Sequence, residues 1–235
     1  MHEITSVKEI SARQLTVERP VTTSTDTSSL SDLEAQFAEH LAVPSEVQDL
    51  LFREARSANT FTDEPVTDEQ VRAIVDLVKW GPTAMNIQPL RIVLVRSPEA
   101  RERLVAHMAE GNRAKTLTAP VVAILAADTN FHDQMHKTFP HNPGARENFV
   151  GDDDRRAQTA HLNSALQIGY FIVGVRAAGL AAGPMGGFDA AGVADEFFPG
   201  GQHRPMVVVN IGHPGPDAFR PRLPRLAFDD VVQSV

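Results

Sequence analysis

The stretch WGPTAMNIQP, Trp80 to Pro89, follows residues with helical periodicity and precedes a run of apolar residues. Its two prolines bracket one threonine, one asparagine and one glutamine. Such a segment holds a fixed backbone path and points several donors and acceptors in one direction. A planar ligand with polar edges, such as a flavin, needs this arrangement, because the protein must orient it and tune its electronics. The alternative interpretation is a proline-rich connection between a helix and a strand, since most loops merely connect.

Both flanks of this stretch carry recognisable signals. Thr67 and Gln70 have the spacing of a capping box at the start of a helix. The apolar residues that follow share one face of that helix: Val71, Ile74, Val75 and Val78. We expect this helix to stop at Gly81-Pro82, and the β-branched run from Ile92 to Val95 predicts a short strand.

Further helices and strands are predicted along the rest of the chain. Ser97-Pro98 predicts the start of a helix that Gly111 ends. Buried strands are predicted from Pro120 to Ala127 and from Met206 to Ile211. Asp152 to Ala178 predicts one long helix whose second half is apolar nearly all round, so we expect it in the middle of the fold or in an interface.

Two shorter helices complete the pattern. Ser45 has the position of an N-cap for a helix that runs through Leu50 to Phe52, and Asp189 is expected to cap a helix that ends at Phe197. Residues 128–151 are predicted to be irregular. The sum is an α+β fold with long helices around a modest sheet, without internal repeats.

Residues 1–45 differ in composition from the rest of the chain. The stretch from Val21 to Asp32 contains eight serines or threonines in twelve residues, which cannot build a core. We interpret it as a tail or linker, followed by a short amphipathic helix from Leu33 to Leu41. Residues 46–235 are then predicted to form one domain.

Composition excludes several classes of function. The 235 residues include no cysteine, which excludes disulfides, cysteine-bound metals and thiol nucleophiles. The net charge of -8 argues against a nucleic-acid-binding protein. No apolar run has membrane-spanning length and no secretory signal is evident, so we expect a cytoplasmic protein. His132 and His136 are four residues apart, but no third ligand is obvious and no metal is expected.

Three further groups of residues have the chemistry of a binding site. Arg56-Ser57 offers a planar guanidinium fork, which suits bidentate contact with a phosphate. The glycines of the stretch from Gly183 to Phe188 let a backbone approach a ligand closely. Arg220 to Arg225, RPRLPR, places three cations among prolines and favours an anion clamp.

Each group also has an ordinary structural interpretation. A lone arginine near a helix end can be solvated, a glycine-rich stretch can be a turn, and a charge run is often a basic tail. Within the stretch from Trp80 to Pro89, the polar side chains could contact a ribityl chain and ring edge or serve the turn itself. Those side chains are Thr83, Asn86 and Gln88.

Taken in chain order, the four groups resemble the nitroreductase superfamily of FMN-dependent oxidoreductases, over about residues 46–235. That family typically shows R-S-x-R, then w-x-P-[ST]-x-x-N-x-Q-P, a G-x-x-G-like loop and a final [KR]-x-R-L-P. Within it, the chain looks closest to the malonic semialdehyde reductase (3-hydroxypropionate dehydrogenase) branch. That closer match depends on KWGPT from Lys79, KTLTAPV from Lys115, FPH from Phe139, GPMxGFD from Gly183 and RLPRLxF from Arg222.

The resemblance implies a central, mainly antiparallel sheet flanked by long helices, in an intertwined homodimer with two FMN sites at the subunit interface. By position, Arg56, Arg220 and Arg222 would hold the FMN phosphate, and Ser57 the ribityl-phosphate region. The other expected cofactor contacts are Asn59, Pro82, Thr83, Ala84, Asn86, Gln88, Pro184, Met185, Gly186 and Gly187. Asn59 stands where the family motif has its second arginine, so one expected contact to the pyrimidine edge of the flavin is altered or absent.

The implied activity is ping-pong reduction of a small carbonyl by NADPH or NADH through FMN, with malonic semialdehyde as the expected substrate and 3-hydroxypropionate as its product. The flavin carries the chemistry, so no catalytic side chain is expected. A substrate carboxylate could bind Arg113, Lys115 or Arg146, and His136 or His141 could donate a proton. The alternatives are a broad nitro or quinone reductase, and a non-catalytic flavin-binding or flavin-sequestering protein.

Overall fold

The computed structural model describes residues 40–235. The chain divides into two units, Met1–Ala42 and Val43–Val235, and the labelled helices and strands belong to the second unit. The serine- and threonine-rich stretch lies outside the described residues, as does the predicted helix Leu33–Leu41 apart from its last two residues. Among residues 40–235, every helix is too short or too polar to span a lipid bilayer.

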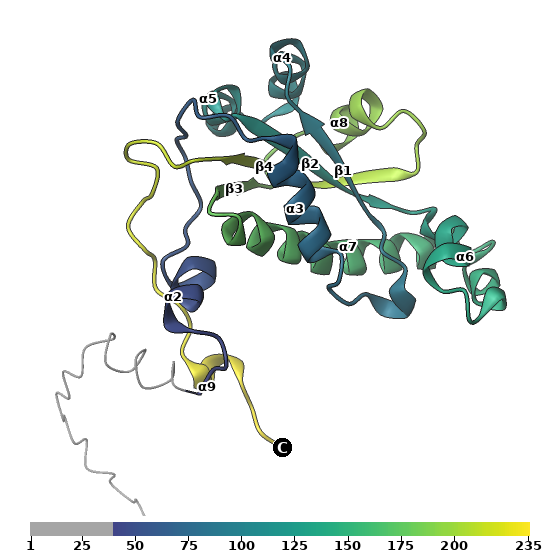
Figure 1. Ribbon diagram of the computed structural model, residues 1–235. Coiled ribbons are helices and arrows are strands. Elements are labelled where there is room, and N and C mark those ends of the chain that lie inside the picture. The colour runs from purple at the N-terminus through teal and green to yellow at the C-terminus, as the bar shows by residue number, and fades with distance from the viewer. Residues whose placement is uncertain (1–39) are drawn as a thin grey trace, which may run out of the picture. The chain divides into compact units, whose positions relative to one another are not determined.

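Four antiparallel strands form the sheet, in the order β1-β2-β4-β3 (Figure 1). Their bounds are Leu90–Val95 for β1, Val121–Asp128 for β2, Ala181–Met185 for β3 and His203–Gly212 for β4. The three predicted strands are β1, β2 and β4, with longer or slightly shifted ends. The prediction of an α+β fold with an antiparallel sheet is confirmed.

Helices surround this sheet on both faces. The longer ones are α3 (Asp68–Val78), α4 (Pro98–His107), α5 (Glu110–Thr118), α7 (Asp153–Ala177) and α8 (Ala190–Phe197). The shorter ones are α2 (Ser45–Gln48), η1 (Asp49–Arg53), η2 (Ala84–Asn86), η3 (Phe131–Gln134), α6 (Met135–Thr138), η4 (Pro143–Phe149) and α9 (Phe228–Val231). The region from 128 to 151, predicted to be irregular, therefore contains short helical turns.

The burial of the central strand β2 shows why helices pack on both faces of the sheet. All eight of its residues are buried, and alternate side chains face opposite sides of the sheet. Val121, Ala123 and Leu125 pack with apolar residues of α3 and α7. Val122 and Ile124 pack with residues of α4 and α8 on the other face. In Figure 1, α7 accordingly runs along one side of the sheet and α4, α5 and α8 lie on the other.

The predicted capping signals are confirmed at three helices. The Thr67 hydroxyl accepts from the Gln70 N–H at 3.2 Å, and the Gln70 side chain accepts from the Thr67 N–H at 2.9 Å. Ser97 caps α4 through its hydroxyl, and Asp189 caps α8 through its carboxylate. Asp152, predicted to be the first residue of the long helix, is its N-cap. The predicted apolar face of α3 is partly wrong, because Val75 is 40% exposed.

Two helix boundaries differ from the sequence prediction. The helix that begins at Pro98 ends at His107, and Gly111 lies inside the next helix, α5. The break has a tertiary cause: Met108 forms a β-bridge with Phe188 there, and the following residue donates its N–H to Gly187 O at 3.0 Å. Ser45 is not an N-cap either, because it is the first residue of α2.

The largest correction concerns residues Gly183 to Phe188. We expected a glycine-rich loop after the long helix, but Gly183, Pro184 and Met185 belong to strand β3. The strand pairs with β4 on one side only, so Pro184 can lie in it without interrupting a ladder on its free edge. Gly186 and Gly187 follow the strand as non-strand backbone.

Candidate functional site

Four arginines line one cavity of about 210 Å³: Arg56, Arg220, Arg222 and Arg225. Ser57 and Asn59 line it too, so the first and fourth predicted groups meet in one place. We expected Arg56 to lie at a helix end, and the structure shows that it does not. The helix η1 ends at Arg53, and residues 55–59 continue as extended chain between β3 and the C-terminal segment.

Backbone hydrogen bonds hold residues 55–59 in this position. The Ala58 N–H donates to Ala182 O at 3.0 Å, and the Asn59 N–H donates to Ala218 O at 2.9 Å. A Cβ atom on Gly183 would lie 2.6 Å from Ala58 O, so the missing side chain permits the close approach. Gly183 therefore has a structural role here, and not the ligand-facing role that the sequence suggested.

The arginines of this cavity carry more positive charge than nearby carboxylates neutralise. Arg222 donates to the carbonyl oxygens of Arg53 and Ala55, and Arg56 donates to Arg220 O at 3.4 Å. Arg56 lies 3.7 Å from the exposed Glu54 carboxylate, while its buried Nε has no hydrogen-bond partner. A buried donor without a partner is costly, and an anion bound here would satisfy it.

Arg176 is a functional candidate that the sequence analysis missed. It lines an adjoining cavity of about 180 Å³ together with Arg56, and it donates to Leu51 O at 2.9 Å. Burial lowers the pKa of the Arg176 guanidinium, and the positive charge of Arg222 lowers it further. A lone arginine in the apolar second half of α7 was the available signal, and it reinforces the positive potential of the site.

The segment from Pro82 to Gln88 is tightly constrained. Met85, Asn86 and Gln88 have φ values of 51°, 50° and 43°, a region that non-glycine residues rarely adopt. Such strain persists only where the surroundings impose it, and it is commonest at functional sites. Here the Ala84 N–H donates to Asn163 Oδ1 at 2.7 Å, and Asn86 Nδ2 donates to Thr138 O at 2.8 Å.

Within one chain, this segment and the arginine-lined cavity are far apart. Ala84 is bound to Asn163 in the first half of α7, whereas Arg176, beside the cavity, lies near its end. At 1.5 Å per residue, the helix separates Asn163 from Arg176 by about 20 Å. The structure therefore brings together the first and fourth predicted groups and Gly183 of the third. Gly187 of the third group instead accepts from Asn112 of α5 at 3.0 Å, and the second group lies apart.

The substrate-binding candidates are also divided between two places. Arg113 donates from Nε to Met108 O at 2.9 Å, on the helix α5 that also carries Lys115. His141 is exposed and its ring packs on Phe139 with centroids 4.0 Å apart, just beyond the Thr138 carbonyl that Asn86 binds. His141 is thus close to the constrained segment, whereas Arg113 and Lys115 belong to the α5 face.

The two histidines considered as metal ligands, His132 and His136, differ in burial. His132 is buried, while His136 is exposed and bonds to Asp133 O at 2.8 Å. In the part of the chain that the structure describes, no three His, Asp or Glu side chains are grouped so as to hold a metal ion.

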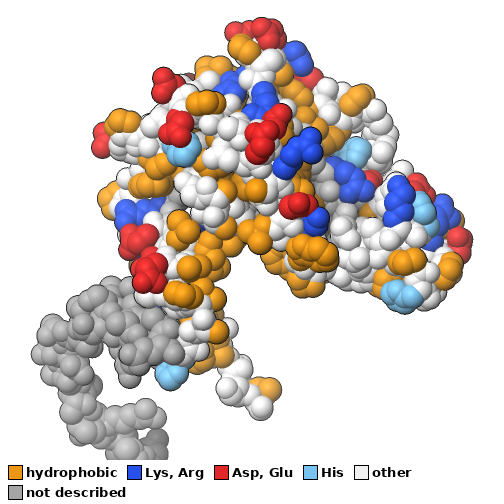
Figure 2. Space-filling model, viewed as in Figure 1, with side chains coloured by type: hydrophobic (Ala, Val, Ile, Leu, Met, Phe, Trp, Pro, Cys, Tyr) orange, Lys and Arg blue, Asp and Glu red, His pale blue; other side chains and the backbone are white. Residues whose placement is uncertain are grey.

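A large apolar groove of about 680 Å³ lies along α7. Its lining includes Phe52, Leu77 and Leu166, which are 61%, 58% and 44% exposed. Figure 2 shows hydrophobic side chains gathered along the edge of the molecule where Figure 1 places α7. Contiguous exposed apolar surface of this kind usually marks an interaction site.

Comparison with solved structures supports the fold. A Bacillus subtilis structure provisionally named a nitroreductase superposes with a TM-score of 0.71 at 24% identity, covering 81% of this chain and 99% of that one. An Exiguobacterium sibiricum protein provisionally named a nitroreductase, solved in complex with FMN, gives a TM-score of 0.66 at 19% identity and covers 82% of this chain and 99% of that one.

Sequence comparison gives the family. A Streptomyces coelicolor protein provisionally named NADH dehydrogenase/NAD(P)H nitroreductase is 66% identical over 195 residues, which are 83% of this chain and 99% of that protein. A Leptothrix cholodnii protein with the same provisional name is 53% identical over 76% of this chain and 91% of its own length. The model of the Nitroreductase family matches residues 52–213. The chain therefore belongs to the nitroreductase family.

Proposed function

We propose that the protein is an FMN-dependent NAD(P)H oxidoreductase formed by residues 46–235. The observation that carries the proposal is the arginine-lined cavity, with its surplus positive charge and the unpartnered buried Nε of Arg56. A phosphate fits this donor set, because guanidinium groups make charge-assisted, often bidentate bonds to phosphate oxygens. Family membership and the FMN bound by the E. sibiricum nitroreductase support the identity of the anion.

In this proposal each group of residues has a defined task. Arg56, Arg220 and Arg222 hold the phosphate, and Ser57 bonds the ribityl-phosphate region beside it. Asn59 lines the same cavity as a further cofactor contact. Residues Pro184 to Gly187 lie along the ring edge. Gly186 suits that position, because no atom lies within 4 Å of where its Cβ would be.

The complete site requires a second copy of the chain. The constrained segment lies too far from the arginine-lined cavity to contribute to the same site within one subunit. The residues concerned are Pro82, Thr83, Ala84, Asn86 and Gln88. The apolar groove along α7 offers a surface for dimerisation, and pairing through it would supply those residues from the partner subunit. We therefore propose a homodimer in the cytoplasm, in which each FMN site is shared.

When bound, FMN would supply the hydride-transfer chemistry between NADPH or NADH and a second substrate. The protein's residues position the reactants and limit access of water, which is sufficient for large rate enhancement. Malonic semialdehyde remains our proposed substrate, with 3-hydroxypropionate as product. Its carboxylate would bind Arg113, Lys115 or Arg146, and His141 or His136 would protonate the new alkoxide.

A broad nitro or quinone reductase is the second candidate, and the provisional names of the relatives favour it. Turnover of malonic semialdehyde, nitrofurazone and a simple quinone should be compared with both nicotinamides. We expect the aldehyde to be reduced fastest. If it is reduced no faster than the quinone, the narrower substrate proposal is wrong and the broad reductase remains.

The cofactor proposal is tested by the visible absorbance spectrum of the purified protein, before and after anaerobic NADPH and NADH. We expect a flavin spectrum that bleaches with at least one nicotinamide. A flavin that does not bleach would indicate a binding or sequestering protein. A colourless protein that takes up no added FMN would overturn the proposal.

A further inference from the structure

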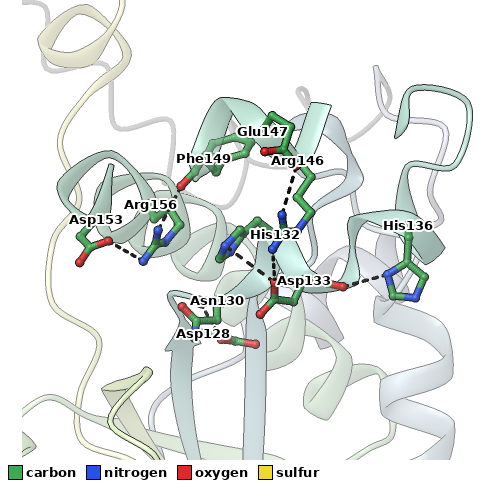
Figure 3. A network of polar contacts seen from close by, with 10 residues as sticks. All are labelled: Asp128, Asn130, His132, Asp133, His136, Arg146, Glu147, Phe149, Asp153 and Arg156. Carbon is green, nitrogen blue, oxygen red and sulfur yellow. Dashed lines mark hydrogen bonds and ion pairs between the residues drawn. The ribbon is translucent and has the colours of Figure 1, made fainter. Parts of the chain in front are cut away.

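His132 is a buried histidine that the proposed reaction does not use. It lies on η3, in the excursion formed by residues 131–149 between β2 and α7, and is 7% exposed. Its Nδ1 is buried without a hydrogen-bond partner, and its Nε2 lies 3.8 Å from the Asp133 carboxylate. Figure 3 shows the ring enclosed by charged side chains from neighbouring elements.

Four charged groups act on the His132 ring: Asp133 on η3, Arg146 on η4, Arg156 on α7 and Asp128 at the end of β2. Burial lowers the pKa of His132, Arg156 and Arg146 lower it further, and the two carboxylates oppose them. Both carboxylates already have arginine partners. Asp133 binds Arg146 at 3.1 Å, and Asp128 binds Arg91 at 2.7 Å.

Residues 131–149 pack against the constrained segment, Pro82 to Gln88, of the candidate site. Phe131, Met135 and Phe149 form a small apolar core with Ile87, and Met85 packs against it. In addition, Asn86 Nδ2 donates to the Thr138 carbonyl at 2.8 Å. Because Thr138 ends the short helix α6 that continues directly from η3, a shift of η3 moves this carbonyl.

We propose that His132 is a proton-sensitive latch, whose neutral ring keeps the excursion packed and whose protonation loosens it together with the Asn86 anchor. The unfolded chain binds a proton on this histidine near pH 6.5, whereas the packed chain resists it. Stability of the excursion is therefore complete above about pH 6.5 and decreases as the pH falls toward the lower pKa of the folded state.

Hydrogen exchange of the full-length protein tests this latch without any cofactor, so its result is separate from the FMN proposal. Exchange of peptides from 131–149 is measured at about pH 7.5 and about pH 5.5, corrected for intrinsic rates, with β2 as internal reference. We expect the opening of the excursion to increase at the lower pH by up to about tenfold, because pH 5.5 lies about one unit below the pKa of histidine in an unfolded chain.

The variant His132→Gln should abolish this increase, while the matched control His136→Gln, an exposed histidine in the same excursion, should retain it. Wild-type exchange that is independent of pH would overturn the proposal, as would an undiminished increase in His132→Gln.

Two charge variants keep the proposal testable if His132→Gln does not fold. Arg146→Gln removes a repelling cation and releases Asp133, so the midpoint of the acid transition should move to higher pH. Asp133→Asn removes an attracting carboxylate, so the midpoint should move to lower pH. Midpoints that do not move in opposite directions would assign the transition to another group.

Discussion

Arg222 combines a structural and a binding role at the scale of single residues. It donates to the carbonyl oxygens of Arg53 and Ala55 and also lines the arginine-lined cavity. In Arg222→Ala a bound phosphate would lose a charge-assisted pair worth about 1.5–3 kcal/mol. We therefore predict that FMN affinity falls roughly ten- to a hundredfold. Titration of the apoprotein with FMN, followed by flavin fluorescence, measures this change in affinity.

The control for Arg222 is Arg204→Ala, which removes an exposed arginine that bonds only to nearby carbonyls on β4 and the turn before it. This variant should leave FMN affinity unchanged. If Arg222→Ala binds FMN as tightly as the wild type, Arg222 does not belong to the site.

Gly183 shows how one missing side chain brings two segments together. Its Cβ would lie 2.6 Å from Ala58 O, a backbone atom that cannot turn away. We predict that Gly183→Ala lowers the free energy of unfolding by about 1–3 kcal/mol, because residues 55–59 must separate from β3. Chemical denaturation measures the effect. Gly111→Ala, a helical glycine with nothing within 4 Å of its Cβ, should be neutral or stabilising.

At the scale of elements, the start of helix α3 is determined by residues close to it in the sequence. Both hydrogen bonds of the Thr67–Gln70 capping box form, although the residues are largely exposed. Thr67→Ala is predicted to lower the free energy of unfolding by about 0.5–2 kcal/mol, since an orphan N–H loses its acceptor. Thr118→Ala, an exposed threonine with only weak bonds of 3.4 and 3.5 Å, should change it by less than about 0.5 kcal/mol.

Other elements depend on distant partners. Strand β3 has the sequence AAGPM, which contains no β-branched residue and has little strand propensity of its own. It is a strand because β4 pairs with it. Likewise, α4 and α5 are separate helices because Met108 pairs with Phe188. Sequence reasoning could not anticipate either outcome, since both decisive contacts join residues far apart in the chain.

At the scale of the whole molecule, the apolar groove along α7 is the surface through which we expect two copies to associate. Leu166→Glu would bury a carboxylate in that interface, at a cost of at least about 3 kcal/mol. We predict that this variant is monomeric at concentrations where the wild type is dimeric, and that it retains less FMN. Sedimentation equilibrium with flavin quantitation checks both outcomes.

Leu117→Glu is the matched control for Leu166→Glu. Leu117 is a 48% exposed leucine on α5, and it does not line the groove. This variant should remain dimeric and keep its flavin. A Leu166→Glu variant that is still dimeric would place the interface elsewhere, and a monomeric wild type would remove the shared-site proposal.

The sequence by itself determined the features that depend on neighbouring residues. Caps at Thr67, Ser97 and Asp189 start their helices, and apolar runs form β1, β2 and β4, because hydrogen bonding and hydrophobic periodicity act over a few residues. The four ordered motifs also indicated the nitroreductase family, which the comparisons confirm.

Only the tertiary structure decided which of these residues and segments lie close together in space. Arg176 joined the arginine cluster, Gly183 became a packing position in β3, and residues 82–88 were held about 20 Å along α7 from the cavity. The physical reason is that sheet pairing and helix packing act between residues distant in sequence, so local pattern carries no information about their distances.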